Sequence, residues 1–393
     1  MGEWKSCTLS SLGTIVGGAT PSTKKPENYE GGTIPWITPK DLSGFSGRYI
    51  SHGERNITEK GLNSCSAQMM PKHSVLFSSR APIGYVAISD CEVCTNQGFK
   101  SIVPNENTDY LFLYYLLQYK KNDIENLGSG TTFKEVSANT MKGVEVRVPA
   151  IKSEQEKIAR VLSSIDDKIE ANARINENLE RQARAIYQNM FENIDSLPAG
   201  WHKVPLGEVI NISNKSFNPL KEPETLLEHY SIPAYDDAKF PVFELSTEIK
   251  SNKFIIDDSC FMISKLNPTT KRVWRPYCLT NNAVCSTEFI VYKAKEESMT
   301  DYLYSVINSD SFSEFMCSHV TGSTGSRQRT TPKDTLFFEV IIPTEEELSA
   351  FQSTVAPMYA LMRNIAVENS KLKETRDALL PKLMSGEIDV SKI

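Results

Sequence analysis

The stretch "IARVLSSIDDKIEANARINENLERQARAIYQNM" (158–190) repeats its apolar residues at steps that alternate between four and three. The resulting seam consists of Ile158, Leu162, Ile165, Ile169, Asn172, Asn176, Leu179, Ala183, Ile186 and Met190. Such steps average 3.5 residues, which is the heptad pattern of a coiled-coil helix. The stretch therefore predicts one long helix that presents a narrow apolar stripe to a partner.

A matching stripe lies further along the same chain. The same spacing recurs at Phe351, Val355, Met358, Met362, Ile365, Asn369, Leu372, Arg376, Leu379 and Leu383. A helix of about 40 residues is ~60 Å long, and a helix with only one apolar stripe needs a partner to be stable. We expect the two helices to pair with each other, most simply in the antiparallel sense, as a coiled coil.

Polar and helix-breaking residues interrupt both stripes. Asn176 and Asn369 recur at the same seam position, and a buried Asn in a coiled coil can fix the register at a cost in stability. Alternatively, these residues only mark the end of the buried stripe. Pro357 and Pro381 lie inside the second stretch, so we expect a late start, a kink or an early end of that helix.

The two helices belong to a larger internal repeat. The segment "EWKSCTLSSLG" (3–13) is echoed by "GWHKVPLGEVI" (200–210), and "LGSGTTFKEVSANTMKGVEVRVPAI" (127–151) is echoed by "TGSTGSRQRTTPKDTLFFEVIIPTE" (321–345). The second pair of segments lies 194 residues apart, and such a period in a chain of 393 residues indicates two copies of one unit. The predicted division is a globular part at 1–149, a long helix at 150–193, a second globular part at 194–343 and a second long helix at 344–393.

Each globular part mixes short strands with one amphipathic helix. The helices are expected at "DYLFLYYL" (109–116) and "DYLYSVIN" (301–308), and the strands at 33–38, 74–79, 85–89, 229–235, 260–265 and 286–294. The expected fold class is α+β: two globular α/β domains in a pseudo-two-fold arrangement, separated by two long helices that form an antiparallel coiled coil.

Composition and motifs exclude several classes of protein. The content of 40% hydrophobic and 23% charged residues is that of a globular protein, and no stretch is long and apolar enough to span a membrane. The cysteines and histidines form no zinc pattern, so we expect reduced cysteines and no bound metal. The loop "TGSTGSRQRTTPKD" (321–334) lacks the Gly-Lys-Ser ending of a phosphate-binding loop, and no catalytic motif is present.

Positive charge is concentrated locally, although the net charge is −6. The segment "KLNPTTKRVWR" (265–275) and the loop at 321–333 carry basic residues and no acid. Arg and Lys neutralise phosphates, whereas Arg, Asn and Gln can read base edges. The candidate DNA-binding residues are Lys40, Arg80, Asn96, Gln97, Lys100, Lys134, Lys265, Asn267, Lys271, Arg272, Arg275, Arg327, Gln328 and Arg329. Arg80 and Lys265 are expected at matching places, each directly after a strand.

These segments resemble a known family. The order of elements, together with "TPSTKKPENYEGGTIPWITPKDL" (20–42), "SSRAPIGYVAI" (78–88), "TNQGFKSIVP" (95–104), "GSGTTFKEVS" (128–137) and "LLPKLMSGEIDV" (379–390), resembles the specificity subunits of type I restriction–modification systems. The resemblance covers essentially the whole chain and is looser in the second globular part.

The resemblance implies a DNA-reading chain without catalytic activity. Each globular part would read one half of a split double-stranded DNA target, and the two helices would act as a ruler for the unread gap. Two modification subunits would bind this chain and methylate adenines, and restriction subunits would join them. S-adenosylmethionine, ATP and Mg²⁺ are then expected on the partner subunits, with no cofactor in this chain. The expected location is the cytoplasm of a bacterium or archaeon.

Two other functions are compatible with the residues alone. The helices could form a scaffold that assembles proteins rather than DNA, in which case binding would lack the steep salt dependence of phosphate contacts. The chain could also be a self-sufficient methyltransferase, which would require it to bind S-adenosylmethionine by itself. The stretch "NPTT" (267–270) is the closest approach to a methyltransferase motif, and it lacks the second proline and the aromatic residue.

Overall fold

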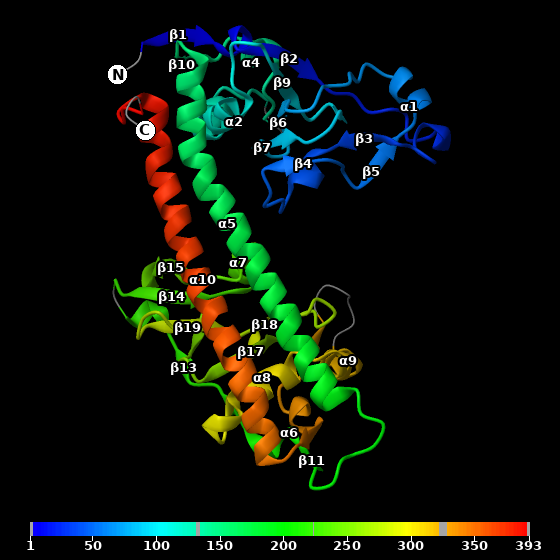
Figure 1. Cartoon of the computed structure of the whole chain (residues 1–393), viewed down its shortest axis with the longest axis vertical. Helices are drawn as coiled ribbons and strands as arrows, with labels where there is room; N and C mark the ends of the chain where they lie inside the picture. Colours follow the sequence, from blue (N-terminus) through cyan, green and yellow to red (C-terminus); the bar gives the residue numbers. More distant parts are fainter. Residues whose placement is uncertain (1–2, 131–133, 223, 322–327, 391–393) are drawn as a thin grey trace. The chain divides into compact units, whose positions relative to one another are not determined.

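The computed structural model describes residues 3–130, 134–222, 224–321 and 328–390. The chain divides into two compact units, the first formed by residues 1–171 with 371–393 and the second by residues 172–370. Both boundaries between the units fall inside the two long helices, α5 (Lys152–Tyr187) and α10 (Glu345–Ser385). Each unit therefore combines one globular part with a segment of each helix (Figure 1). No helix in the described ranges is long and apolar enough to cross a membrane.

The helices are antiparallel within each unit. In the first unit, the start of α5 packs through Ile158 and Leu162 in the same core cluster as Leu383 near the end of α10. In the second unit, Tyr187 at the end of α5 lies against Phe351 near the start of α10. Seam residues are buried or half-buried, whereas most residues between them are exposed. The heptad seam and its antiparallel pairing are therefore confirmed.

A polar pair lies within the seam of the second unit. Asn172 is buried, and its Nδ2 donates hydrogen bonds to Asn369 Oδ1 at 2.8 Å and to the Glu368 carboxylate at 2.7 Å. Asn176 instead donates to the Met362 carbonyl oxygen at 3.2 Å. The two asparagines that match in sequence therefore do not pair with each other, because antiparallel helices bring unlike positions together.

The second helix passes through both of its prolines. Helix α10 includes Pro357 and Pro381, so the expectation of a late start or an early end is wrong. The helix starts at a capping box in which the Thr344 hydroxyl donates to Glu347 at 2.7 Å, and the Glu347 amide donates back to that hydroxyl at 3.4 Å. Trp201 Nε1 donates to the same carboxylate at 2.5 Å and ties the start of α10 to its own unit.

The globular part of the first unit is built on a mixed sheet. Its order is β2 (Gly13–Gly17), β9 (Lys100–Pro104), β6 (Val75–Ser79), β7 (Ile83–Ser89), β4 (Tyr49–Ile50). Smaller sheets pair β1 (Trp4–Thr8) with β10 (Glu145–Pro149), and β3 (Ile34–Ile37) with β5 (Arg55–Ile57) and β8 (Cys94–Thr95). Its shorter helices are α1 (Glu59–Asn63), α2 (Tyr110–Tyr119), α3 (Lys121–Asn126) and α4 (Ala138–Lys142). Helix α2 covers the sheet with Phe112 and Tyr115 in the core.

The second unit repeats this plan. Its corresponding sheet has the order β12 (Ile210–Ser213), β20 (Phe289–Ala294), β17 (Cys260–Ser264), β18 (Val273–Trp274), and β11 (His202–Pro205) pairs with β23 (Glu339–Ile342). A further sheet has the order β13 (Ser216–Phe217), β16 (Lys253–Ile255), β19 (Ala283–Ser286), β14 (Leu226–Tyr230), β15 (Val242–Leu245). A short hairpin joins β21 (Val320–Thr321) to β22 (Arg329–Thr330). Its shorter helices are α6 (Leu206–Val209), α7 (Ile232–Ala238), α8 (Thr300–Ile307) and α9 (Asp310–Ser318).

Most predicted elements are present, and one is wrong. The expected strands at 33–38, 74–79, 85–89, 260–265 and 286–294 overlap β3, β6, β7, β17 and β20, and the two expected helices are α2 and α8. The segment 229–235 is not one strand, because β14 ends at Tyr230 and α7 begins at Ile232. The Ser231 hydroxyl caps α7 by accepting from the Ala234 amide, and Pro233 lies in the first turn, where proline is tolerated.

Candidate nucleic-acid interface

In the first unit, the Gly-rich segment after α3 crosses the end of the main sheet. Ser129 and Glu135 pair across it through backbone hydrogen bonds of 3.1 and 2.9 Å. The next amide, of Val136, donates to the Ser79 carbonyl oxygen at 3.0 Å, and the Ser79 amide donates to the Gly98 carbonyl oxygen at 2.7 Å. The segment is thus attached where β6 ends and just before β9 begins.

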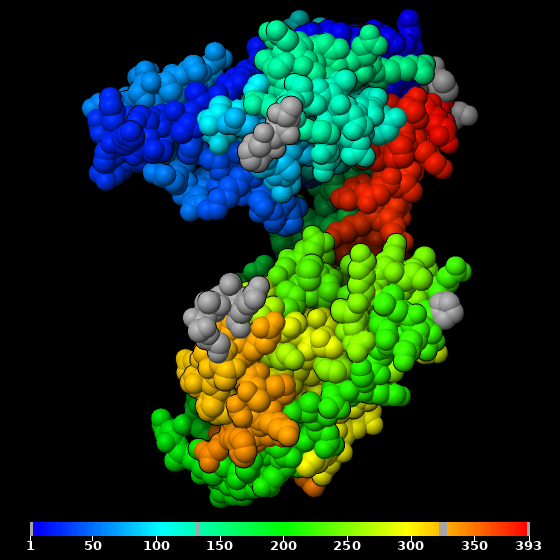
Figure 2. Space-filling view, turned by 180° about the vertical axis from the view of Figure 1, so that it is seen from behind, coloured from blue at the N-terminus to red at the C-terminus, as the bar shows by residue number. Residues whose placement is uncertain are grey.

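This attachment brings three predicted basic residues together around one acid. The Glu135 carboxylate lies 3.6 Å from the Arg80 guanidinium and 3.4 Å from Lys100 Nζ. Lys100 is mostly buried, with 13% of its side chain exposed, whereas Arg80 is one-third exposed. Lys134 directly precedes Glu135 and is exposed. Figure 2 shows this face of the molecule, where described parts of segment 100–150 reach the surface in cyan to green.

The other candidates of the first unit lie in neighbouring loops. Asn96 Oδ1 accepts a hydrogen bond from the Gly98 amide at 2.8 Å and so shapes the turn before β9. Gln97 is exposed and accepts a hydrogen bond from the Thr20 hydroxyl. Lys40 is exposed and pairs with Glu54 at 2.7 Å. Asn96 is therefore a turn-forming residue, and Gln97 and Lys40 present polar groups at the surface.

The second unit has the same attachment at the end of its sheet. The Thr330 amide donates to the Lys265 carbonyl oxygen at 3.1 Å, and the Lys265 amide donates to the Glu288 carbonyl oxygen at 2.9 Å. Arg329 binds the Glu288 carboxylate through two nitrogens, at 2.9 and 3.0 Å. The Arg329 guanidinium holds the pKa of Glu288 below its usual value, and nearby Lys265 adds to this effect.

Two further candidates lie beside this attachment. The Asn267 amide donates to the Gln328 carbonyl oxygen at 2.9 Å, so the turn after β17 lies against the strand that carries Arg329. Arg327 lies outside the described residues. The structure therefore brings Lys265, Asn267, Gln328 and Arg329 together.

The hydrogen bonds correct one correspondence between the two units. Ser79 donates to Gly98 and accepts from Val136, just as Lys265 donates to Glu288 and accepts from Thr330. Lys265 therefore matches Ser79, and the expected match with Arg80 is displaced by one residue. Strands β6 and β17 both end in a serine, so the sequence alone matches the residue after each strand, Arg80 with Lys265.

The basic residues at 271–275 do not join the loop cluster. Arg272 binds Asp236 through two nitrogens at 2.6 and 2.8 Å, and Arg275 pairs with the buried Asp301. Lys271 Nζ donates to the carbonyl oxygens of Asn308 and Ser309. Burial lowers the pKa of Lys271, and the nearby Arg184 lowers it further. The segment 265–275 is one basic run in sequence, but its later part is engaged inside the second unit.

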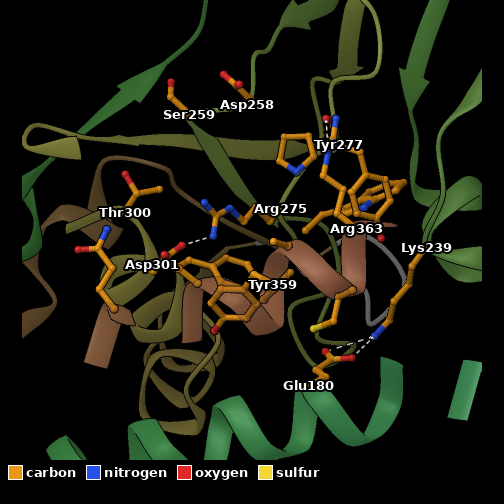
Figure 3. Close-up of a pocket in the computed structure, with 18 of the residues that line it drawn as sticks. Glu180, Lys239, Asp258, Ser259, Arg275, Tyr277, Thr300, Asp301, Tyr359 and Arg363 are labelled. Atoms are coloured by element: carbon orange, nitrogen blue, oxygen red, sulfur yellow. Dashed lines mark hydrogen bonds and ion pairs between the residues drawn. The ribbon is translucent and has the colours of Figure 1, made fainter. Parts of the chain in front are cut away.

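Arg275 and Asp301 line a cavity of about 560 Å³ in the second unit (Figure 3). Arg275 points to Asp301 beside the ring of Tyr359, whose centroid lies 5.6 Å from the guanidinium carbon. Lys239 donates to Glu180 of α5 at 2.9 Å, and Arg363 of α10 donates to the Tyr277 carbonyl oxygen at 3.2 Å. Burial raises the pKa of Tyr359 to about 12. These contacts fasten the globular part of this unit to its own helix segments.

A comparable anchor lies in the first unit. Arg376 of α10, a seam residue, donates to Asp166 of α5 at 2.9 Å, and the Tyr115 hydroxyl of α2 donates to the same carboxylate at 2.5 Å. Arg48 pairs with Asp167. The adjacent acids Asp166 and Asp167 thus form the contact between helix and globular part.

Sequence reasoning missed the acids that organise these sites. Glu135 lies within "GSGTTFKEVS" (128–137), but neither it nor Glu288 is basic, so neither is among the candidate phosphate contacts. The 194-residue period does align Glu135 with Arg329, and this opposite charge at equivalent positions was a usable signal. All eight cysteines are free thiols, and no group of three or more potential metal ligands occurs among the described residues.

Comparison with known proteins identifies the relatives of the chain. The family model described as the type I restriction modification DNA specificity domain matches residues 1–181. The specificity subunit of the type I restriction enzyme MjaIX from Methanocaldococcus jannaschii is 32% identical over 425 aligned positions, which cover 100% of this chain and 95% of that protein. The EcoR124I/EcoR124II specificity subunit of Escherichia coli is 30% identical over 171 positions, 42% of this chain and 41% of that one.

A solved structure has the same fold. The crystal structure of the type I restriction–modification S subunit from M. genitalium aligns with a TM-score of 0.60 at 19% sequence identity. The alignment covers 98% of this chain and 96% of that one. The expected α+β fold class is therefore confirmed over nearly the full length.

Proposed function

The chain belongs to the specificity subunits of type I restriction–modification systems, and from this premise we propose that it reads a DNA target made of two separate half-sites. Specificity subunits are DNA-recognition chains and not enzymes, and they act in a complex with DNA and modification subunits. The proposal concerns how this chain does so. One globular part, 1–149, reads one half-site, and the other, 194–343, reads the second.

The observation that carries the proposal is the repetition of one construction in both units. Each unit attaches a later segment to the end of its main sheet by a backbone hydrogen bond, from Val136 or from Thr330, and each attachment lies beside two cations, Arg80 with Lys100 and Lys265 with Arg329. A protein that reads one continuous site has no need for two such surfaces. Basic residues beside a closely approaching backbone are the usual means of contacting DNA phosphates.

The long helices are proposed to serve as spacer and docking elements. In this proposal the ranges 150–193 and 344–393 set the unread gap between the half-sites and bind two modification subunits, to which restriction subunits are added. S-adenosylmethionine, ATP and Mg²⁺ belong to those partners. The seam residues that face the other helix hold the spacer together and are therefore not the docking surface.

The DNA-binding set is narrower than the sequence implies. We assign the loop-end residues Arg80, Lys100, Lys134, Lys265, Gln328 and Arg329 to DNA contact, with Arg327, Lys40 and Gln97 nearby in sequence or in the same loops. Lys271, Arg272 and Arg275 are assigned to holding the second unit together, because their acceptors Asn308, Asp236 and Asp301 lie in other elements of that unit and not at the loop attachment.

Duplex binding at several salt concentrations tests the proposal. For the complex of this chain with its modification subunits, the logarithm of the duplex affinity should fall linearly with the logarithm of the salt concentration. The slope should be about −0.9 for each phosphate contacted. Modification subunits alone are the control and should show a much shallower slope. Equal slopes with and without this chain would contradict the proposal and favour a scaffold that binds only proteins.

A further inference from the structure

Both loop attachments contain the same set of charges in an exchanged arrangement. In the first unit, the acid is on the loop (Glu135) and the cations Arg80 and Lys100 are on the sheet. In the second unit, Arg329 on the loop faces Glu288 on the sheet, with Lys265 beside it. Each site therefore holds one carboxylate between two cations, although the residues that supply them are not equivalent.

The location of the carboxylate makes it a tether. Glu135 is the residue directly before Val136, whose amide closes the loop onto Ser79. Arg329 stands in the same relation to Thr330 and Lys265. In both units the ion pair therefore lies next to a backbone hydrogen bond that fixes the segment to the strand end. These carboxylates are 41% and 30% exposed, so the pairs are accessible to a polyanion.

Cations outnumber the carboxylate at each site. Arg80, Lys100 and Lys134 accompany Glu135, Lys265 and Arg329 accompany Glu288, and the sequence at 130–133 and 322–327 contains no acidic residue. A phosphate that approaches must compete with the carboxylate for the same cations. Removal of the carboxylate would therefore strengthen phosphate binding, which depends on charge alone, while it releases the loop.

From these observations, and resting on the proposed function, we propose that Glu135 and Glu288 are positioning residues that tether the DNA-reading loops and limit sequence-independent phosphate binding. Each carboxylate occupies cations that would otherwise bind any duplex. Preference for the correct sequence then depends on the carboxylate, because a tethered loop presents fixed side chains and the surrounding charge stays low.

Replacement of each carboxylate by a neutral amide, with matched controls, tests whether the carboxylates limit sequence-independent phosphate binding. Glu288→Gln and Glu135→Gln should each add about one phosphate contact to non-cognate binding, which is a roughly 3.5-fold greater loss of affinity between about 50 and 200 mM salt. The ratio of cognate to non-cognate affinity should fall. Glu296→Gln and Glu106→Gln make the same charge change just past the opposite ends of β20 and β9, and both should leave slope and ratio unchanged. If the tether variants behave like these controls, the proposal is overturned.

Amide hydrogen exchange of the full chain without DNA tests the tether separately. Glu288→Arg and Arg329→Glu should each speed the exchange of the Thr330 amide, and the double substitution, which restores the pair in reverse, should restore slow exchange. Exchange that is equally slow in both single variants overturns the tether. If the wild-type complex shows no salt-dependent duplex binding, the proposed function fails and the limiting role with it, and the exchange result still decides the tether.

Discussion

The arginines of this chain have two different roles that their sequence neighbourhoods do not separate. Arg80 is one-third exposed and shares Glu135 with Lys100 at the base of a loop. Arg272 is held by both oxygens of Asp236, and its side chain is 14% exposed. Arg329 has the same bidentate pairing with Glu288, but its side chain is 42% exposed, so burial and not pairing alone keeps the Arg272 guanidinium inside the protein.

The two arginines should therefore respond oppositely to truncation. Arg80→Ala should weaken duplex binding by the complex and reduce the salt slope by about one phosphate contact. Arg272→Ala should leave the salt slope unchanged and lower the melting temperature, because it leaves Asp236 without its partner. Binding isotherms at several salt concentrations and thermal denaturation of the same preparations measure both effects. An unchanged slope in Arg80→Ala would place the DNA-contacting surface elsewhere.

For individual residues, the sequence predicted the charge of a segment but not which of its side chains lie in the loop and which lie in the interior. It correctly marked the loop ends as basic, but it could not divide 265–275 into loop and interior. The reason is physical: the segment runs from the end of β17 through a turn into β18, and successive side chains of a strand point to opposite faces. Trp274, which lies among the basic residues in sequence, is buried in the core together with its neighbour Val273.

At the level of elements, the start of α10 depends on one carboxylate. Glu347 accepts from the Thr344 hydroxyl and amide and from Trp201 Nε1, and the Thr344 hydroxyl is the leading cause of its lowered pKa. A lowered pKa means that the ionised form is favoured in the folded state. This contribution to stability is thus fully present above the ordinary pKa of 4.5 and disappears as the pH falls through the lower folded value.

Acid titration of stability should report this cap. The wild-type chain should lose stability below about pH 4.5, and Glu347→Gln should show a smaller loss over that window. Glu346→Gln, at the neighbouring exposed position, is the control and should follow the wild type. Chemical denaturation from pH 7 to pH 3 measures these differences. An identical pH dependence in Glu347→Gln and wild type would exclude the cap as a source of acid sensitivity.

A second prediction concerns the pairing of helices α5 and α10. Asn172 is buried and bonded to Asn369 across the two helices, so Asn172→Leu should destabilise the second unit by about 1 kcal/mol through loss of this hydrogen bond. Asn172→Leu with Asn369→Leu should recover much of that loss. A double-mutant cycle from denaturant unfolding gives the coupling energy, and additive effects would contradict a direct pair.

The sequence could predict that these helices pair, but not which asparagines meet. The heptad pattern can be read from the consecutive residues of one segment. The partners across the two helices depend instead on the register between two segments nearly 200 residues apart. The same distinction explains why the continuous α10 was not expected. Proline removes a backbone donor wherever it occurs, but helix packing on both sides of Pro357 can still hold the helix together.

On the scale of the whole molecule, the internal repeat was the most informative signal. It predicted two copies of one construction, and the two main sheets share the order of four strands and the loop attachment. The repeat does not predict which bases are read, because the two loops differ in the residues that occupy equivalent positions. Glu135 and Arg329 show this most clearly.

Methylation mapping in a host that expresses this chain with its modification subunits tests the central claim most directly. The mapped adenines should define a motif of two specified half-sites separated by an unspecified gap. Replacement of residues 194–343 by the corresponding segment of the MjaIX relative should change one half-site and leave the other intact. A continuous motif, or a change in both half-sites after this single exchange, would contradict the claim that each globular part reads its own half of the target.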